Sequence, residues 1–407
     1  MSPRIGSRHP PLRGLWTRSI STVLGLGVAA ALIVGMQLPL LHRPSDAHIV
    51  LRALRPAGTH PAIAWPTVGS AALVIPSIGI KESHNDSVVP IASLTKLMTA
   101  YVLLKRLPLA GGATGPCVTV SSNDVATYEA MKLTDQSSVA VSVGESICEL
   151  DLLNGLLVHS ASNYAVLLAE MVAGNTTSFI ALMNQTAQAL GLARTHYADV
   201  SGFDDGSVST ALEQGELAVM LMKSPLVRSI VDQTSVTLPV AGTVNSFTPY
   251  VGIDNVIGVK SGRTAAAGGC DVMAVTFELG DQIKIAYAIV LGQRGGDLLG
   301  PAGDAALALA QTAIGSEVRV ELQKGRIFGR VGWAGATVPI GLAQNEQFSW
   351  WSAKGSVPLT ARVRRFTGTV QRGETVGWLV VHATTNHRYR LVAESTVSPP
   401  SLWQRLR

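Results

Sequence analysis

An uncharged apolar run at residues 19–41 is the feature that most constrains how this chain folds. It exceeds the roughly 20 residues that a helix needs to cross a bilayer, so it predicts a transmembrane anchor. Arginines but no acidic residue precede it within residues 1–18, which favours a cytoplasmic N-terminus. A cleaved signal peptide is the alternative, although the run ends without a small-x-small exit. Under either interpretation we expect the rest of the chain to be exported across the cell membrane.

The patterns beyond this run predict two folded regions. The first alternates apolar strands with amphipathic helices, which indicates an α/β domain: an antiparallel sheet flanked by helices, with an all-helical insert. The second has short strands separated by Gly and Pro, typical of a small all-β domain. In chain order we expect a basic segment, the anchor, a linker, the α/β domain, the all-β domain and a tail, at residues 1–18, 19–41, 42–64, 65–315, 316–397 and 398–407.

The spacing of apolar residues also predicts individual elements of the α/β domain. Residues 69–75 indicate its first strand, and residues 111–144 indicate short strands and polar turns. A helical pattern over 150–173 is interrupted by a polar break at 158–164. The domain then closes with a strand, a hairpin and a helix, at residues 256–260, 270–279 with 283–291, and 302–314.

Composition excludes some classes of protein. Only 14% of the residues are charged and 47% are hydrophobic, which indicates a folded chain. The net charge of +5 nearly vanishes when the arginines of residues 1–18 are set aside. No basic stripe interleaved with aromatic residues lies in the centre of the chain, so we expect no nucleic-acid partner.

The chain has three cysteines, Cys117, Cys148 and Cys270, and none belongs to a C-x-x-C pair, so a zinc site has no support. In an oxidising compartment one bridge and one free thiol is the natural arrangement. Cys117 and Cys148 lie in short β-like runs that flank one excursion of the chain, so we expect them to pair. Three buried free thiols are the alternative.

A candidate nucleophile lies at the start of the helix that follows the first strand. Ser93 and Lys96 are three residues apart, so their side chains share one helix face. A serine becomes nucleophilic beside a proton acceptor, and a lysine can serve when burial lowers its pKa. The helix N-terminus adds positive potential where an oxyanion would form. Taken alone, the pattern equally fits an N-capping serine beside a solvated lysine.

A second polar cluster ends the predicted strand at 256–260 and contains Lys260, Ser261, Gly262, Arg263 and Thr264. A cation and hydroxyls on one strand edge can hold a carboxylate, and a glycine lets a substrate backbone approach closely. The simpler interpretation is a strand that ends in a solvated lysine.

A third cluster, with Ser160, Ser162 and Asn163, forms the polar break in the helical insert. Such a break suits a proton shuttle or a clamp for a substrate amide. A kinked or capped helix junction is the simpler interpretation of this cluster alone.

Taken together, the clusters follow the order S-x-x-K, a serine-rich turn, then K-[ST]-G. This order resembles the D-alanyl-D-alanine carboxypeptidase family, the low-molecular-mass penicillin-binding proteins among the penicillin-recognising serine peptidases. Five flanking segments resemble that family too: PIASLTKLMTA, LLVHSASNYAVLLAEMVAG, FIALMNQTAQALGL, SGFDDGSVSTA and VIGVKSGRTAAAGGC. The resemblance covers the whole α/β domain, and the all-β domain also fits the family.

The resemblance implies a mechanism and a substrate. Ser93 would attack the carbonyl between the two terminal D-alanines of a peptidoglycan stem peptide, and Lys96 would take its proton. Ser160 would relay a proton toward the leaving D-alanine. Water would then hydrolyse the acyl-enzyme, with no metal or cofactor, and a β-lactam antibiotic would acylate Ser93 in the same way.

The resemblance also implies which residues bind the substrate. Lys260 would hold the terminal carboxylate together with Ser261 and Thr264. The backbone N–H groups of Ser93 and Arg263 would form the oxyanion hole. The Arg263 side chain would add a second cation for the carboxylate, or it would simply face solvent.

Two positions depart from the family pattern. The second motif is usually Ser-x-Asn, but Ser162 occupies the place of the asparagine and Asn163 follows one residue later. A slip of one residue on a helix rotates a side chain by about 100°, so we do not expect Asn163 to replace the missing carboxamide fully. The other departure, Ser261 for the usual threonine, keeps the hydroxyl.

These observations predict a serine-type D-Ala-D-Ala carboxypeptidase that acts in cell-wall synthesis and cell shape. A β-lactamase-like hydrolase on the same fold is one alternative, although no motif offers the deacylating carboxylate that it needs. A non-catalytic or weakly active wall-binding homologue is the other, and the missing asparagine would fit it.

Overall fold

The computed structural model describes residues 46–49, 51, 54 and 62–398, apart from 111, 280, 334–335, 352–355, 367 and 384–385. The predicted anchor at 19–41 therefore lies outside the described residues. The chain divides into two compact units, one with residues 55–320 and 349–356, the other with 1–54, 321–348 and 357–407.

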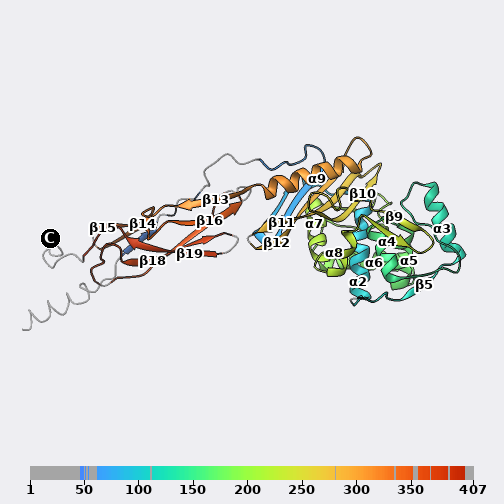
Figure 1. Cartoon of the computed structure of the whole chain (residues 1–407), viewed down its shortest axis with the longest axis horizontal. Helices are drawn as coiled ribbons and strands as arrows, with labels where there is room; N and C mark the ends of the chain where they lie inside the picture. Colours follow the sequence, from blue (N-terminus) through green and yellow to red (C-terminus); the bar gives the residue numbers. More distant parts are fainter. Residues whose placement is uncertain are drawn as a thin grey trace, which may run out of the picture. The chain divides into compact units, whose positions relative to one another are not determined.

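A five-stranded antiparallel sheet forms the centre of the larger unit (Figure 1). The strands, in their order across the sheet, are β10 (Val256–Thr264), β11 (Gly268–Leu279), β12 (Gln282–Gln293), β2 (Ser70–Ile75) and β3 (Ile80–His84). Strand β2 comes from the start of the unit and lies beside β12 from its end, so that Ser70 is opposite Leu291. The sheet thus joins the two ends of the unit into one core.

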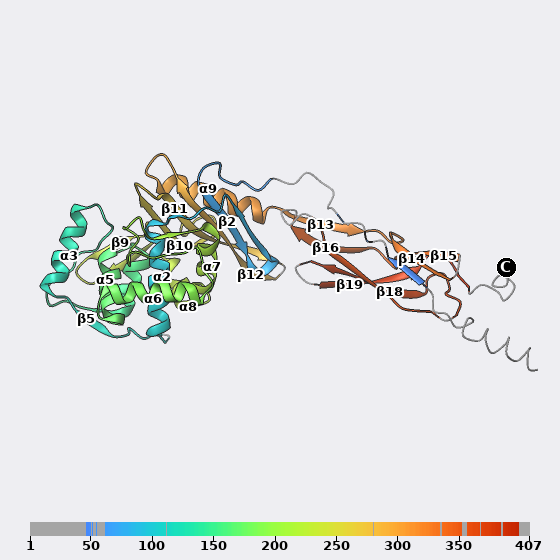
Figure 2. The same cartoon turned by 180° about the vertical axis from the view of Figure 1, so that it is seen from behind.

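Helices cover both faces of this sheet. Figures 1 and 2 show α9 (Leu299–Ile314) along one face and α7 (Ala211–Leu221) on the other. Because side chains alternate along a strand, Leu73 packs in the same core as α9, whereas Val74 packs in the same core as α7. Burial on both faces explains why β2 is apolar along nearly its whole length, whereas the edge strand β3 is mostly exposed and polar.

The remaining helices and small sheets lie between β3 and β10 in the chain, as the predicted helical insert requires. The helices are α2 (Thr95–Arg106), α3 (Ser122–Leu133), α4 (Glu149–Leu157), α5 (Ser162–Ala173), α6 (Thr176–Ala189) and α8 (Pro225–Val231). The small sheets pair β4 (Val89–Pro90) with β7 (Val208–Ser209), β5 (Cys117–Thr119) with β6 (Ser146–Cys148), and β8 (Ser235–Leu238) with β9 (Gly242–Asn245).

Within the described ranges, no single helix has the length and hydropathy to cross a membrane. Helices α5 and α6 pass that test only as a pair, and the chain bends by 84° between them. Residues of both helices, such as Tyr164 and Phe179, belong to the buried core of the unit.

The structure corrects the expectation for residues 111–144, which contain helix α3. Ser121 and Asp124 form a reciprocal capping box at its start. None of its residues is buried, so it has no apolar stripe of helical period that would predict it from sequence.

The predicted pairing of Cys117 with Cys148 is confirmed. The two cysteines are directly opposite each other on β5 and β6 and form a disulfide. Cys270 on β11 is a buried free thiol. The disulfide links the two ends of the segment 117–148, which contains α3 and the loop after it.

The smaller unit is built on a six-stranded antiparallel sheet, in agreement with the predicted all-β character. Across the sheet its strands are β1 (Asp46–Ile49), β14 (Ile327–Trp333), β15 (Ala336–Leu342), β19 (Asn386–Ala393), β18 (Thr375–His382) and β17 (Leu359–Val363). A further pair, β13 (Glu317–Leu322) and β16 (Glu346–Trp351), forms a separate two-stranded sheet. Strand β1 lies in the segment expected to be a linker, and its pairing with β14 is a long-range contact that local sequence does not indicate.

Candidate active site

The predicted nucleophile lies at a sharp entry into a buried helix. Ser93 is in a 3₁₀ turn (Ala92–Leu94) that runs directly into α2. The Lys96 Nζ donates a hydrogen bond to the Ser93 Oγ over 2.9 Å. Ala92 has a φ of +48°, a conformation that L-residues rarely adopt and that recurs at functional sites. The turn therefore presents Ser93 at the surface while its partner Lys96 points into the core.

The buried lysine has an environment suited to a proton acceptor. Lys96 is fully buried, and its Nζ also donates to the Ser201 carbonyl oxygen over 2.8 Å. Burial lowers its pKa well below the ordinary value, the charge of Lys260 lowers it further, and the Asp199 carboxylate opposes them. Lys96 can thus be neutral at a pH where an exposed lysine carries a proton.

Asp199, which the sequence did not single out as a functional residue, organises the loop behind Lys96. Its carboxylate accepts hydrogen bonds from the hydroxyls of Ser201 and Ser207 and from the backbone N–H groups of Gly202 and Phe203. Burial raises its pKa, but these hydrogen bonds outweigh burial and leave the pKa below its usual value. The loop they fix carries the Ser201 carbonyl that binds Lys96. An Asp two and three residues before its partners is the local signal for such a turn.

Ser160 occupies the break between α4 and α5. Its φ is +61°, and among the described residues its buried Oγ has no hydrogen-bond partner. A hydroxyl that lines the cleft without a protein partner is free to bond to a group that enters it.

The two residues after this break point in different directions. Ser162 begins α5 and lines the cleft beside Ser160. Asn163, in contrast, is buried: its carboxamide donates to the Val139 carbonyl over 2.8 Å and accepts from the Val139 N–H over 3.1 Å. The structure therefore does not bring Asn163 to the cleft, and its predicted contact with substrate is not supported. The carboxamide instead anchors the loop that contains Val139.

Strand β10 forms the opposite wall. A Cβ placed on Gly262 would lie 2.5 Å from the backbone nitrogen of Ser93, so only glycine permits this approach. Ser261 donates from its Oγ to the Phe247 carbonyl oxygen over 2.8 Å. The K-S-G strand and the Ser93 turn are thus in direct contact, although Gly262 lies 169 positions after Ser93 in the chain.

Lys260 lies beneath this wall rather than on its surface. It is fully buried, and its Nζ donates to the Ser261 carbonyl oxygen over 2.7 Å. Burial lowers its pKa to about 7, and the charge of Asp271 opposes that shift. Asp271 is itself fully buried on β11 directly opposite Ser261, and burial raises its pKa well above the ordinary value. The sequence did not indicate Asp271, because an isolated carboxylate in an apolar strand has no local pattern.

The rim of the cleft carries charged side chains. Arg263 is half-exposed, and its Nη2 lies 3.6 Å from the Asp135 Oδ2 on the loop after α3. Thr264 accepts from the Ala267 N–H and lies 3.5 Å from the Asp205 Oδ1. Arg263 and Asp135 both line the cleft, so this ion pair lies at its rim.

These elements enclose a cleft of about 730 Å³ in the larger unit. Of the predicted site residues, those that line it are Ser93, Ser160, Ser162, Ser261, Gly262, Arg263 and Thr264. Lys96 and Lys260 lie directly beneath it. Among the residues that the structure describes, no three His, Cys, Asp or Glu side chains are grouped as metal ligands would be.

Comparison with known proteins agrees with this geometry. The profile of the peptidase S11 family, described as D-alanyl-D-alanine carboxypeptidase, matches residues 78–294, more than half of the chain. The chain belongs to this family. The match contains every predicted site residue of this D-alanyl-D-alanine carboxypeptidase family member, from the Ser93 turn to the K-S-G strand.

Curated relatives include the D-alanyl-D-alanine carboxypeptidase DacC of Escherichia coli, which is 30% identical over 223 residues, 53% of each protein. A D-alanyl-D-alanine endopeptidase of Pseudomonas aeruginosa is 34% identical over 163 residues, 39% of this chain and 48% of the relative. The chain thus spans about half the length of the curated relatives that it matches.

Solved structures share the fold. The D-alanyl-D-alanine carboxypeptidase DacD from Francisella tularensis superposes with a TM-score of 0.59 at 20% identity, covering 86% of this chain and 98% of that one. The Streptomyces K15 DD-transpeptidase covers 63% of this chain and 98% of its own, with a TM-score of 0.53 at 23% identity. At such identities the likeness establishes the fold alone.

The approach of β10 to the nucleophile gives a direct prediction. Gly262→Ala places a methyl group 2.5 Å from the Ser93 nitrogen, so the strand or the turn must shift. A displacement of this kind should slow the labelling of Ser93 by fluorescent penicillin about 100-fold. The control is Gly368→Ala, where the added carbon meets no atom within 4 Å. Equal labelling rates for the two variants would contradict the close approach.

Proposed function

We propose that this chain is a serine-type D-Ala-D-Ala carboxypeptidase that removes the terminal D-alanine from peptidoglycan stem peptides. The observation that carries the proposal is the hydrogen bond from the buried Lys96 to Ser93, at the base of a cleft lined by Ser160 and the K-S-G strand. Family membership supports the same activity.

In the proposed acylation, the Ser93 oxygen bonds to the carbonyl carbon of the penultimate D-alanine. The Ser93 proton passes to neutral Lys96, and the bond from that carbon to the nitrogen of the last D-alanine breaks. Ser160, whose hydroxyl has no partner among the described residues, relays a proton to the leaving amine. The N–H groups of Ser93 and Arg263 stabilise the oxyanion.

Carboxylate recognition completes the proposal. Ser261, Thr264 and the Arg263 guanidinium face the cleft and hold the substrate carboxylate. Lys260 contributes its charge from beneath the strand. Water then cleaves the acyl ester and returns the proton to Ser93. A β-lactam enters the same site because its amide takes the place of the D-Ala-D-Ala bond.

The anchor and the disulfide indicate where the protein acts. Residues 19–41 anchor the chain in the cell membrane with the N-terminus in the cytoplasm, so the catalytic unit faces the wall. The disulfide between Cys117 and Cys148 supports an exported catalytic unit, since such bridges persist in oxidising compartments.

The experiment that tests the activity uses the purified full chain, fluorescent penicillin and a pentapeptide ending in D-Ala-D-Ala. Covalent labelling with release of D-alanine is expected, and Ser93→Ala should lower release by at least about 10³-fold. Ser178→Ala, an exposed serine on α6, is the matched control and should behave as wild type. Rapid turnover of penicillin would indicate a β-lactamase instead, and no labelling of wild type would indicate a non-catalytic protein.

The two buried lysines predict a bell-shaped pH dependence of penicillin acylation. The rate should rise with pH as Lys96, whose pKa is lowered, loses its proton and becomes the base. It should fall again as Lys260, with a pKa of about 7, loses the charge that attracts the carboxylate. In Lys260→Arg the guanidinium stays charged, so the falling limb should disappear. Stopped-flow rates measured from about pH 5 to about pH 9 record both the rise and the fall. If the acylation rate of Lys260→Arg still falls at high pH, Lys260 is not the group whose deprotonation causes the fall.

The departure at residue 162 gives a further prediction. Ser162→Asn places a carboxamide in the cleft, and one additional hydrogen bond to the substrate in the transition state would raise D-alanine release about tenfold. Ser162→Ala keeps a small side chain without that amide and should show no gain. If both variants release D-alanine at the same rate, the missing asparagine does not limit activity.

A further inference from the structure

The smaller unit carries the positive charge of this protein. Residues 321–398 contain ten Lys and Arg against four Glu and no Asp, a net charge of +6. The whole chain has a net charge of +5, so the other residues together have a net charge of −1, even though the arginines of residues 1–18 contribute +4 to that sum. A charge concentrated in this way points to an anionic partner for this unit.

Four basic and aromatic side chains share one face of the six-stranded sheet. Arg362 on β17 is opposite Trp378 on β18, and Trp378 is opposite Arg390 on β19. Residues directly opposite in antiparallel strands point to the same side, so these three form one row across the sheet. Arg388 is two residues from Arg390 and therefore lies on the same face. We call Arg362, Trp378, Arg388 and Arg390 the arginine face.

The arginine face is open and its charges are not neutralised. The three arginines are exposed, and among the described residues none has a carboxylate within 4.0 Å. The Arg388 guanidinium stacks over the Trp378 ring, 4.2 Å from its centroid. One of the three cations thus contacts the half-buried indole, and the other two lie on the strands at either side of it.

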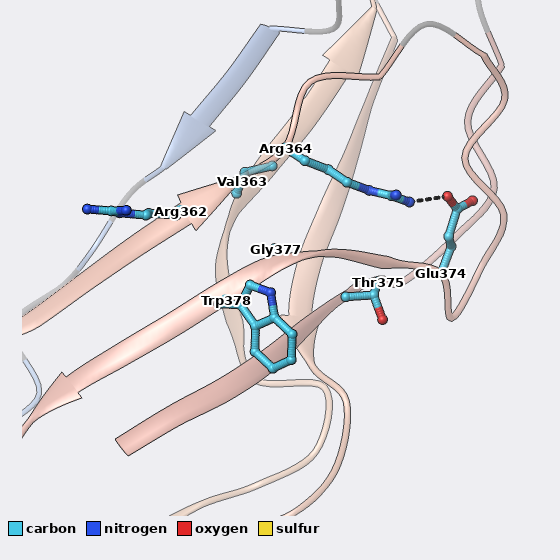
Figure 3. Close-up of a pocket in the computed structure, with 7 residues that line it drawn as sticks. All are labelled: Arg362, Val363, Arg364, Glu374, Thr375, Gly377 and Trp378. Atoms are coloured by element: carbon cyan, nitrogen blue, oxygen red, sulfur yellow. Dashed lines mark hydrogen bonds and ion pairs between the residues drawn. The ribbon is translucent and has the colours of Figure 1, made fainter. Parts of the chain in front are cut away.

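A shallow cavity of about 510 Å³ adjoins this face and is lined in part by Arg362 and Trp378 (Figure 3). Figure 3 also shows Arg364 paired with Glu374 at the far side of the cavity. The charge of Arg364 is therefore neutralised by Glu374, whereas Arg362 has no carboxylate partner among the residues that the structure describes.

The connection to the chain's N-terminus indicates which surface lies near this sheet. Strand β1 joins the sheet through β14, and it begins five residues after the end of the proposed membrane anchor at residue 41. Five residues reach at most about 18 Å. The β1 edge of the sheet is therefore held close to the bilayer surface, where phosphate groups lie. The arginine face on β19, β18 and β17 is three to five strands from that edge, about 14–24 Å across the sheet, so it stays within reach of the same surface.

We propose that the arginine face binds the anionic phospholipid headgroups of the membrane that holds the anchor. This inference rests on the proposed membrane location. The guanidinium group of an arginine can donate two parallel hydrogen bonds to the oxygens of one phosphate. An indole side chain is favoured at the membrane–water interface, and basic side chains are attracted to anionic lipids there. The smaller unit then acts as a membrane-surface module in addition to the single anchor.

The test places the full chain in lipid nanodiscs and measures hydroxyl-radical oxidation of Trp378 by peptide mass spectrometry. Nanodiscs contain either phosphatidylcholine alone or phosphatidylcholine with phosphatidylglycerol. We expect at least a threefold lower oxidation of Trp378 with phosphatidylglycerol, and recovery in high salt because salt screens the contact. The variant Arg362→Glu/Arg390→Glu should lose this protection. Arg319→Glu, an exposed arginine on β13 outside this sheet, should keep it.

Other outcomes overturn the inference. Equal Trp378 oxidation in both nanodiscs, with Ser93 still labelled by penicillin, would refute lipid binding and leave the proposed activity intact. Failure of the chain to enter either nanodisc would refute the membrane location and lipid binding together. Protection of Trp378 by soluble polyphosphate or RNA but not by phosphatidylglycerol would assign the face to a different polyanion.

Discussion

The candidate site depends on the burial of one cation. Lys96 is held in the core by its bonds to Ser93 and to the Ser201 carbonyl, and the Asp199 loop supplies that carbonyl. Burial disfavours its charged form, which turns an ordinary lysine into a proton acceptor. A second buried cation, Lys260, strengthens the effect by repulsion. The cost of burying both amines is offset by their hydrogen bonds and by the carboxylates nearby.

The sheet makes this arrangement possible. Strand β10 is at one edge of the sheet, and its Gly262 approaches the backbone of Ser93 more closely than a side chain would allow. The helical insert supplies Ser160 from the other side. Each wall of the cleft therefore comes from a different part of the chain, and the rigid core beneath them holds the walls at fixed separation.

Sequence reasoning succeeded where periodicity was strong and failed where it was absent. The apolar strands, the helical insert and the Cys117–Cys148 bridge were predicted correctly. Helix α3 and strand β1 were missed: α3 buries no residue, and β1 is defined by its pairing with β14. The basic excess of the smaller unit was also overlooked, since its arginines are spread over several strands and meet only across the sheet.

The sequence by itself determined the pairing of Ser93 with Lys96, because a spacing of three residues at the start of a helix places both side chains together. It also determined the order of the motifs and hence the family resemblance. Only the tertiary structure decided that Asn163 turns toward Val139 and away from the cleft, that Lys260 lies beneath β10, and that Asp271 accompanies it. These outcomes depend on contacts between distant segments, and local spacing carries no information about which side of a core such a residue will face.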